Sequence, residues 1–156
     1  MNPLVDETGN RPIHVPPLIV MSLCLRTIMN SKKNVNEIVA ASALVCNQVQ
    51  IDDTKSLEEQ TKMRFTVVRQ LESQPYPAGF MEMVGKEKKK SGGFSIQAER
   101  TEASLLNFLI ARIHLCDPDV IVGHNFAGFD LDVLLHRMKA LNIQHWHRLG
   151  RLKRKK

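Results

Sequence analysis

The chain has 156 residues, of which 43% are hydrophobic, a composition typical of one globular domain and unlike that of a disordered chain. It has no run of about 18 apolar residues and no basic-then-apolar start, so we expect a soluble protein that is neither secreted nor bound to a membrane. Six of its 22 basic side chains lie in residues 148–156, and the remaining 16 equal the 16 acidic ones, so the net charge of +6 belongs to this tail.

The N-terminal half predicts an extended arm followed by three strands. The prolines within residues 1–17 fix φ and remove hydrogen-bond donors, which favours an arm over a helix. Apolar and β-branched runs then predict a mostly buried strand from Leu18 to Thr27, a second from about Glu37 to Val49, and a third from Arg64 to Leu71.

The middle of the chain predicts irregular structure. Residues 73–79 contain two prolines and a glycine, which are expected to break regular structure. Residues 85–93 contain four lysines and predict a charged exposed loop, followed by a short segment from Phe94 to Ala98.

The C-terminal half predicts two helices and a strand between them. The first helix begins at the N-cap Thr101, places three apolar side chains on one face and ends at Asp117. Residues 120–122 are all apolar, as in a parallel strand buried on both faces. The second helix runs from about Gly128 to Leu141, with Asn142 as its stop. The order of elements predicts an α/β fold, in which a three-strand meander leads into a crossover back to the same sheet.

The cysteines and histidines predict no metal site. Cys24, Cys46 and Cys116 are odd in number, widely spaced and set in apolar segments, which indicates reduced thiols in the core. His145 and His147 lack paired cysteines at metal-ligand spacing, so a structural zinc ion is not expected.

The segment from Asp119 to Asp130 carries the most specific pattern. An apolar strand ends there in Gly123, His124 and Asn125, and Asp130 follows in the first turn of the next helix. Asn125 can hydrogen-bond a substrate or nearby backbone, and Asp130 is expected to point toward a cleft at the sheet's edge. This pattern resembles the second exonuclease motif of the B-family DNA polymerases. The same residues alone could also form an ordinary turn and a helix N-terminal charge.

The resemblance extends over about Leu18 to Lys156 and implies a ribonuclease-H-like, DnaQ-type exonuclease fold. It implies three parts: the extended arm, residues 1–17; a partial exonuclease-like domain, residues 18–147; and the basic tail, residues 148–156. The chain is expected to end before the last motif of the family.

Active members of the family use two metal ions, held in part by an Asp-x-Glu pair on the first strand. A spacing of two places both carboxylates on one face of a strand. The resemblance aligns Cys24 with the Asp and Arg26 with the Glu, so both ligands are lost. A thiol is a poor ligand for Mg²⁺, and a guanidinium repels it. We therefore predict no catalytic residue, no metal ion and no cofactor in this chain.

The loss of these carboxylates is a feature of the α-type and ζ-type branches of the family, and the pattern around Ser22 to Thr27 and residues 150–154 favours the α type. The resemblance then implies a parent DNA-directed DNA polymerase that uses Mg²⁺. It also implies a DNA or RNA–DNA primer-template, primase and an accessory B subunit as partners, and a nuclear location. The predicted phosphate contacts are Arg148, Arg151, Lys153 and Arg154, although a short basic run can also be merely solvated.

Two other classes of function stay open on the sequence alone. One is an active exonuclease whose metal site has moved to Asp132, Glu99 or Glu102. The other is a protein-interaction module, with which the lysine-rich segment is compatible.

Overall fold

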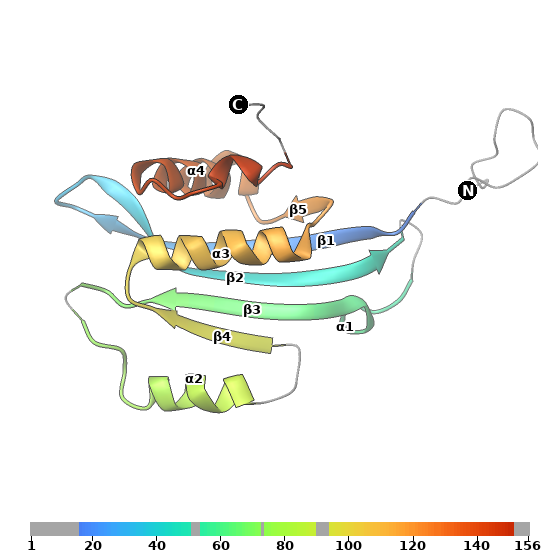
Figure 1. The fold of residues 1–156 in the computed structure, drawn as a ribbon, viewed down its shortest axis with the longest axis horizontal. Coiled ribbons are helices and arrows are strands. Elements are labelled where there is room, and N and C mark those ends of the chain that lie inside the picture. The colour runs from blue at the N-terminus through green and yellow to red at the C-terminus, as the bar shows by residue number, and fades with distance from the viewer. Residues whose placement is uncertain (1–15, 51–53, 73, 90–93, 152–156) are drawn as a thin grey trace, which may run out of the picture.

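Five strands form one mixed sheet in a computed structural model, which describes residues 16–50, 54–72, 74–89 and 94–151. The first three, β1 (Leu18–Asn30), β2 (Val35–Val49) and β3 (Thr61–Arg69), pair antiparallel as the predicted meander. β4 (Phe94–Glu99) runs parallel to β3, and β5 (Val120–Val122) runs parallel to β1. The strand order is β4-β3-β2-β1-β5 (Figure 1).

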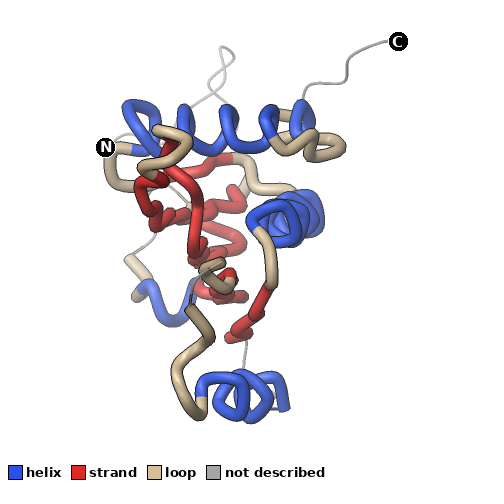
Figure 2. Tube along the Cα trace, turned by 90° about the vertical axis from the view of Figure 1, so that its left-hand side faces the viewer, coloured by secondary structure: helices blue, strands red, loops and turns tan. Residues whose placement is uncertain are grey.

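The long helices lie around the sheet at three positions. α3 (Glu102–Cys116) crosses one face of the strands, α4 (Leu131–Ala140) lies toward the β5 edge, and α2 (Phe80–Lys89) lies beyond β4 (Figure 1). Figure 2 shows α3 end-on beside the strands, with α4 and α2 at opposite ends of the molecule. Three shorter elements complete the fold: α1 (Leu57–Gln60), the π-helix η1 (Phe126–Asp130) and the 3₁₀-helix η2 (Trp146–Arg148).

The hydrophobic core lies between the α3 face of the sheet and the two helices α3 and α4. Alternate residues of each strand face it, because successive side chains of a strand point to opposite faces. Leu23 pairs with Ala43, and Ala43 pairs with Phe65, so these three buried side chains form one row across the sheet. The largest fully buried side chains are Phe65, Met21, Leu23, Ile38, Leu105, Leu106, Leu109, Leu134, Met138 and Val67.

The predicted boundaries of α3 are confirmed by its caps. The Thr101 hydroxyl accepts a hydrogen bond from the Ser104 amide at 3.1 Å, and the Ser104 hydroxyl accepts one from the Thr101 amide at 3.3 Å. At the other end Asp117 adopts a left-handed conformation with φ of 44°. Leu105, Leu109 and Ile113 are buried, as their spacing predicts.

The prediction of a charged loop over residues 85–93 is wrong for its described part. α2 covers Phe80 to Lys89, and residues 90–93 lie outside the described residues. Phe80 stacks on Tyr76 with ring centroids 4.8 Å apart, and Val84, one helical turn later, is buried. This apolar pair holds the helix against the β4 edge, which the lysine content obscured.

Two expectations about burial are also wrong. β5 is not buried on both faces: Val120 and Val122 are exposed, because their side chains lie with Ser22 on the face of the sheet opposite α3. Cys24 is not a core thiol but is exposed, whereas Cys46 is buried and Cys116 half-buried. Ser22, Cys24 and Arg26 are exposed and alternate along β1 with buried Met21, Leu23 and Leu25, so β1 is buried on one face only.

No helix in the described part of the chain is long and apolar enough to cross a membrane. Nearly all of the predicted arm, residues 1–15, lies outside the described residues. The predicted tail begins within η2, and its residues 152–156 also lie outside them.

Candidate functional site

The turn after β5 lies directly against β1. Val120 and Val122 pair with Val20 and Ser22, so β5 ends beside the first half of β1. A Cβ atom at Gly123 would lie 2.6 Å from the Leu23 carbonyl oxygen and 3.2 Å from the Phe126 Cβ. Only glycine fits this close approach, which explains why the apolar strand ends in Gly123.

Beyond this glycine the chain turns into the π-helix η1. Asn125 adopts a left-handed conformation with φ of 49°, and its carbonyl accepts a hydrogen bond from the Phe129 amide at 3.0 Å. The Asn125 side-chain oxygen packs where a Cβ at Gly128 would be. Asp130 is the last residue of η1, so the helix predicted from Gly128 begins as a π-helical turn and becomes α-helical at Leu131.

The face of the sheet opposite α3, called the open face from here on, carries the other residues of the site. Cys24 and Arg26 are exposed and two residues apart on β1, so both lie on the open face. Cys24 follows directly after Leu23, the residue against which Gly123 packs. The structure therefore brings the Gly123 turn, at the end of β5, beside Cys24 in the middle of β1.

This arrangement contains no cluster of carboxylates. Within the described residues, no group of three or more His, Cys, Asp or Glu side chains is placed to hold a metal ion. Asp130 is half-buried, and its side chain makes no capping hydrogen bond at the start of α4. His124 and Asn125, which precede Asp130 in the same motif, are exposed.

A family model described as "DNA polymerase family B, exonuclease domain" matches residues 3–156. The chain belongs to this family.

The relatives of this B-family exonuclease domain are α catalytic subunits. The chain is 40% identical to the DNA polymerase alpha catalytic subunit of Oryza sativa over 148 residues, which are 91% of the chain and 10% of the relative. It is 40% identical to the Xenopus laevis subunit over 89% of the chain and 33% identical to the Mus musculus subunit over 92%, each match covering 9% of the relative. The chain thus spans about a tenth of the length of these curated relatives. These matches confirm the resemblance to the α type.

Glu102, one of the alternative ligands of a relocated metal site, is a buried carboxylate with structural partners in this B-family domain. One Glu102 oxygen accepts hydrogen bonds from the Ile38 amide at 2.7 Å and from the Arg137 guanidinium at 2.9 Å, and Arg137 also bonds the other oxygen. This contact raises the pKa of Arg137. Glu99 accepts a hydrogen bond from Gln97, and Asp132 pairs with His136 on the exposed surface of α4.

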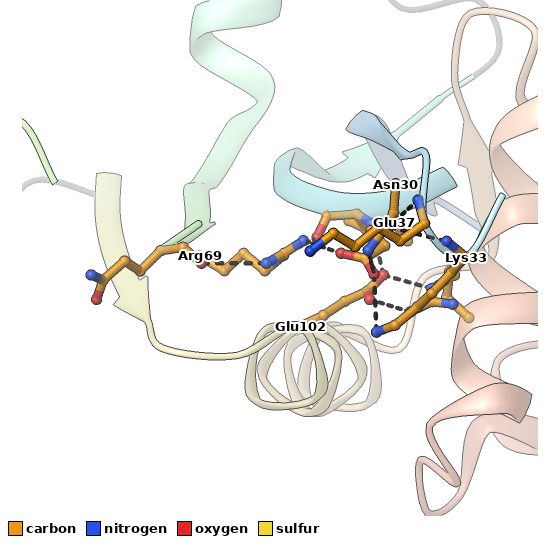
Figure 3. A network of polar contacts seen from close by, with 9 residues as sticks. Asn30, Lys33, Glu37, Arg69 and Glu102 are labelled. Atoms are coloured by element: carbon orange, nitrogen blue, oxygen red, sulfur yellow. Dashed lines mark hydrogen bonds and ion pairs between the residues drawn. The ribbon is translucent and has the colours of Figure 1, made fainter. Parts of the chain in front are cut away.

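Glu102 is part of a larger polar network around a β-bulge, shown in Figure 3. Arg26 pairs with Ala40 and Thr27 pairs with Ile38, which leaves Val39 as an extra residue in β2. The Ile38 carbonyl accepts a hydrogen bond from Arg69 at 2.9 Å, and the Ile38 amide donates to Glu102. Two buried ionic side chains therefore satisfy the peptide groups of this residue.

The second pair of the network is Glu37 with Arg69. Arg69 donates to Glu37 at 2.7 Å, Asn30 donates to the other Glu37 oxygen at 2.8 Å, and Lys33 lies 3.7 Å from it. Burial raises the pKa of Glu37, but the Asn30 hydrogen bond and the charges of Arg69 and Lys33 outweigh it, so this pKa lies below its ordinary value of 4.5. The sequence signalled neither pair, because their partners lie more than 30 residues apart.

The predicted phosphate contacts lie in different settings. The Arg151 guanidinium donates to Asp117 at 2.7 Å and to Asp119 at 2.9 Å. A hydrogen bond from the Ile19 amide, together with Arg151, holds the pKa of Asp119 below its ordinary value. Arg148 lies in η2, while Lys153 and Arg154 lie outside the described residues. Arg151 thus already has two carboxylate partners, with which a phosphate would compete.

Proposed function

We propose that this chain is a catalytically inactive 3′–5′ exonuclease-like domain of an α-type replicative DNA polymerase, with a structural role. The observation that carries the proposal is the placement of Cys24 and Arg26. They occupy adjacent same-face positions of β1, beside the turn that carries the second exonuclease motif, where the family resemblance requires two carboxylates. A thiol and a guanidinium supply no hard oxygen ligand for Mg²⁺.

The parent protein is, by the same proposal, a DNA-directed DNA polymerase that extends primers at the start of replication. The names of the relatives support this, and so does their length of about ten times the matched segment. The proposal includes Mg²⁺ for the parent, primase and an accessory B subunit as partners, and a nuclear location. None of these partners is assigned to a residue of this chain.

The proposal is tested by titrating the chain with Mn²⁺ in a calorimeter. The unmodified chain is expected to bind no ion at this site. The double variant Cys24→Asp, Arg26→Glu places two carboxylates on the open face, and it is expected to gain Mn²⁺ binding. Binding by the unmodified chain that Asp130→Ala removes would contradict the proposal.

A contact between the tail and DNA remains part of the proposal, supported by the charge of residues 148–156. The logarithm of the constant for duplex binding falls linearly with the logarithm of the salt concentration. If Arg148, Arg151, Lys153 and Arg154 each neutralise a phosphate, replacing all four by Ala makes this slope shallower by about 0.9 per contact. The slope is measured from binding isotherms at several salt concentrations. Because Arg151 is held by Asp117 and Asp119, we expect Arg151→Ala alone to change the slope least. An unchanged slope in the fourfold variant would remove the tail from the proposal.

A further inference from the structure

Two hollows meet on the open face of the sheet, around Leu44 of β2 and Arg64 of β3. One, of about 290 Å³, is lined by side chains that include Ser22, Ser42, Thr66 and Phe94. The other, of about 530 Å³, lies beside α1 and is lined by Leu57, Glu58, Thr61 and Lys62. Leu44 and Arg64 line both, so the two hollows form one continuous surface.

The apolar part of this surface is aliphatic and accessible. Leu57 of α1 is 61% exposed, and Leu44 is half-buried between the two hollows. Phe94 is half-buried at the start of β4. A hollow bordered by an exposed leucine suits an aliphatic side chain from a bound segment.

The polar part of the surface is positively charged. Arg64 and Lys62 are exposed, and neither makes a hydrogen bond or ion pair with any residue in the described part of the chain. Glu58 is the one carboxylate among the described residues that line the hollows. Arg26 lies on the same face of the sheet, on β1. Arg64 and Lys62 can therefore form ion pairs with the carboxylates of a partner without giving up a partner within the described part of the chain.

We propose that the open-face groove, defined by Leu44, Leu57, Lys62, Arg64 and Phe94, binds an acidic peptide segment of a partner protein that also carries leucine-like side chains. The leucines enter the hollows, and the carboxylates pair with Arg64 and Lys62. Single-stranded nucleic acid fits less well, because bases need accessible aromatic faces for stacking. The aromatic ring that lines the groove among the described residues is that of the half-buried Phe94, because the ring of Phe65 packs on the other face of the sheet against Phe108 of α3.

The test measures binding of a fluorescent synthetic peptide of alternating glutamate and leucine by anisotropy, with the whole 156-residue chain. Arg64→Glu is expected to weaken binding about tenfold, since it replaces an attraction by a repulsion at the interface. Leu57→Ser is expected to weaken binding about threefold, because it removes exposed apolar area. The matched controls are Lys139→Glu on α4 and Leu115→Ser near the end of α3, both exposed and both outside the groove.

The outcomes separate the proposal from its rivals. The controls are expected to bind the peptide as the unmodified chain does, and a peptide with lysine in place of glutamate is expected not to bind. Equal losses in Arg64→Glu and Lys139→Glu would overturn the proposal, as would an absence of peptide binding. Binding of oligo-dT that depends on Arg64, with no binding of the peptide, would assign the groove to nucleic acid instead. None of these readouts depends on nuclease activity, so the test of peptide binding is independent of the test of the proposed function.

Discussion

Ile38 shows how single residues decide the interior of this domain. The bulge at Val39 takes the peptide groups of Ile38 out of the regular ladder of strand hydrogen bonds. The buried side chains of Glu102 and Arg69 bond the Ile38 amide and carbonyl instead. The sequence suggested Glu102 as an alternative metal ligand and not as a structural carboxylate. Its partner Arg137 lies 35 residues further on, and local periodicity carries no information on such a pair.

Removing Glu102 should therefore be among the costly substitutions in the chain. Glu102→Ala leaves the Arg137 guanidinium and the Ile38 amide without their acceptor, and we expect a loss of about 3–5 kcal/mol in the free energy of unfolding. Urea denaturation measures it. Asp132→Ala, which removes an exposed contact with His136 on the same helix as Arg137, is the control and should cost less than about 0.5 kcal/mol. Equal losses in the two variants would show that the buried Glu102–Arg137 pair contributes no more to stability than an exposed contact does.

Glu37 makes stability depend on pH in a definite direction. Because its folded pKa lies below the ordinary value of 4.5, the ionised carboxylate stabilises the fold above that value. This contribution is lost as the pH falls through the lowered pKa. Glu37→Gln should thus lower stability at neutral pH and flatten its decline below pH 4.5, as urea midpoints across that range would reveal. A decline as steep as that of the unmodified chain would assign the acid sensitivity to other carboxylates.

At the scale of elements, the sequence predicted those helices and strands whose positions are set by neighbouring residues. The meander, α3 with its caps and the strand before Gly123 follow from alternation, capping residues and turn residues. α2 was missed because its lysines outnumber its apolar anchors Phe80 and Val84. The exposure of β5 was missed because burial depends on which faces of the sheet are covered, which an apolar triplet does not reveal.

The α3 cap gives a prediction at this scale. Thr101→Ala removes the acceptor for the Ser104 amide, and it should cost about 1 kcal/mol of stability. Thr101→Ser keeps a hydroxyl at the cap and should stay within a few tenths of a kcal/mol of the unmodified chain. Thermal or urea unfolding distinguishes the two. A similar loss in both variants would trace the effect to the threonine methyl group rather than to the cap.

At the scale of the whole molecule, the fold places a recognisable exonuclease motif beside a first strand that contains no carboxylate. The candidate site residues Gly123, Asn125, Cys24 and Arg26 were found from sequence because they lie in two short segments with fixed spacing. Their position relative to each other came from the parallel pairing of β5 with β1. The open-face groove could not be predicted, since it combines residues from α1, β2, β3 and β4.

We propose that this domain does not hydrolyse DNA. The most direct measurement incubates the 156-residue chain with end-labelled single-stranded DNA and Mg²⁺ or Mn²⁺ and follows shortening from the 3′ end. We expect no degradation above the background of a mock preparation. Metal-dependent degradation that Asp130→Ala abolishes would contradict it, and would mean that Asp130 acts with metal ligands other than the positions of Cys24 and Arg26.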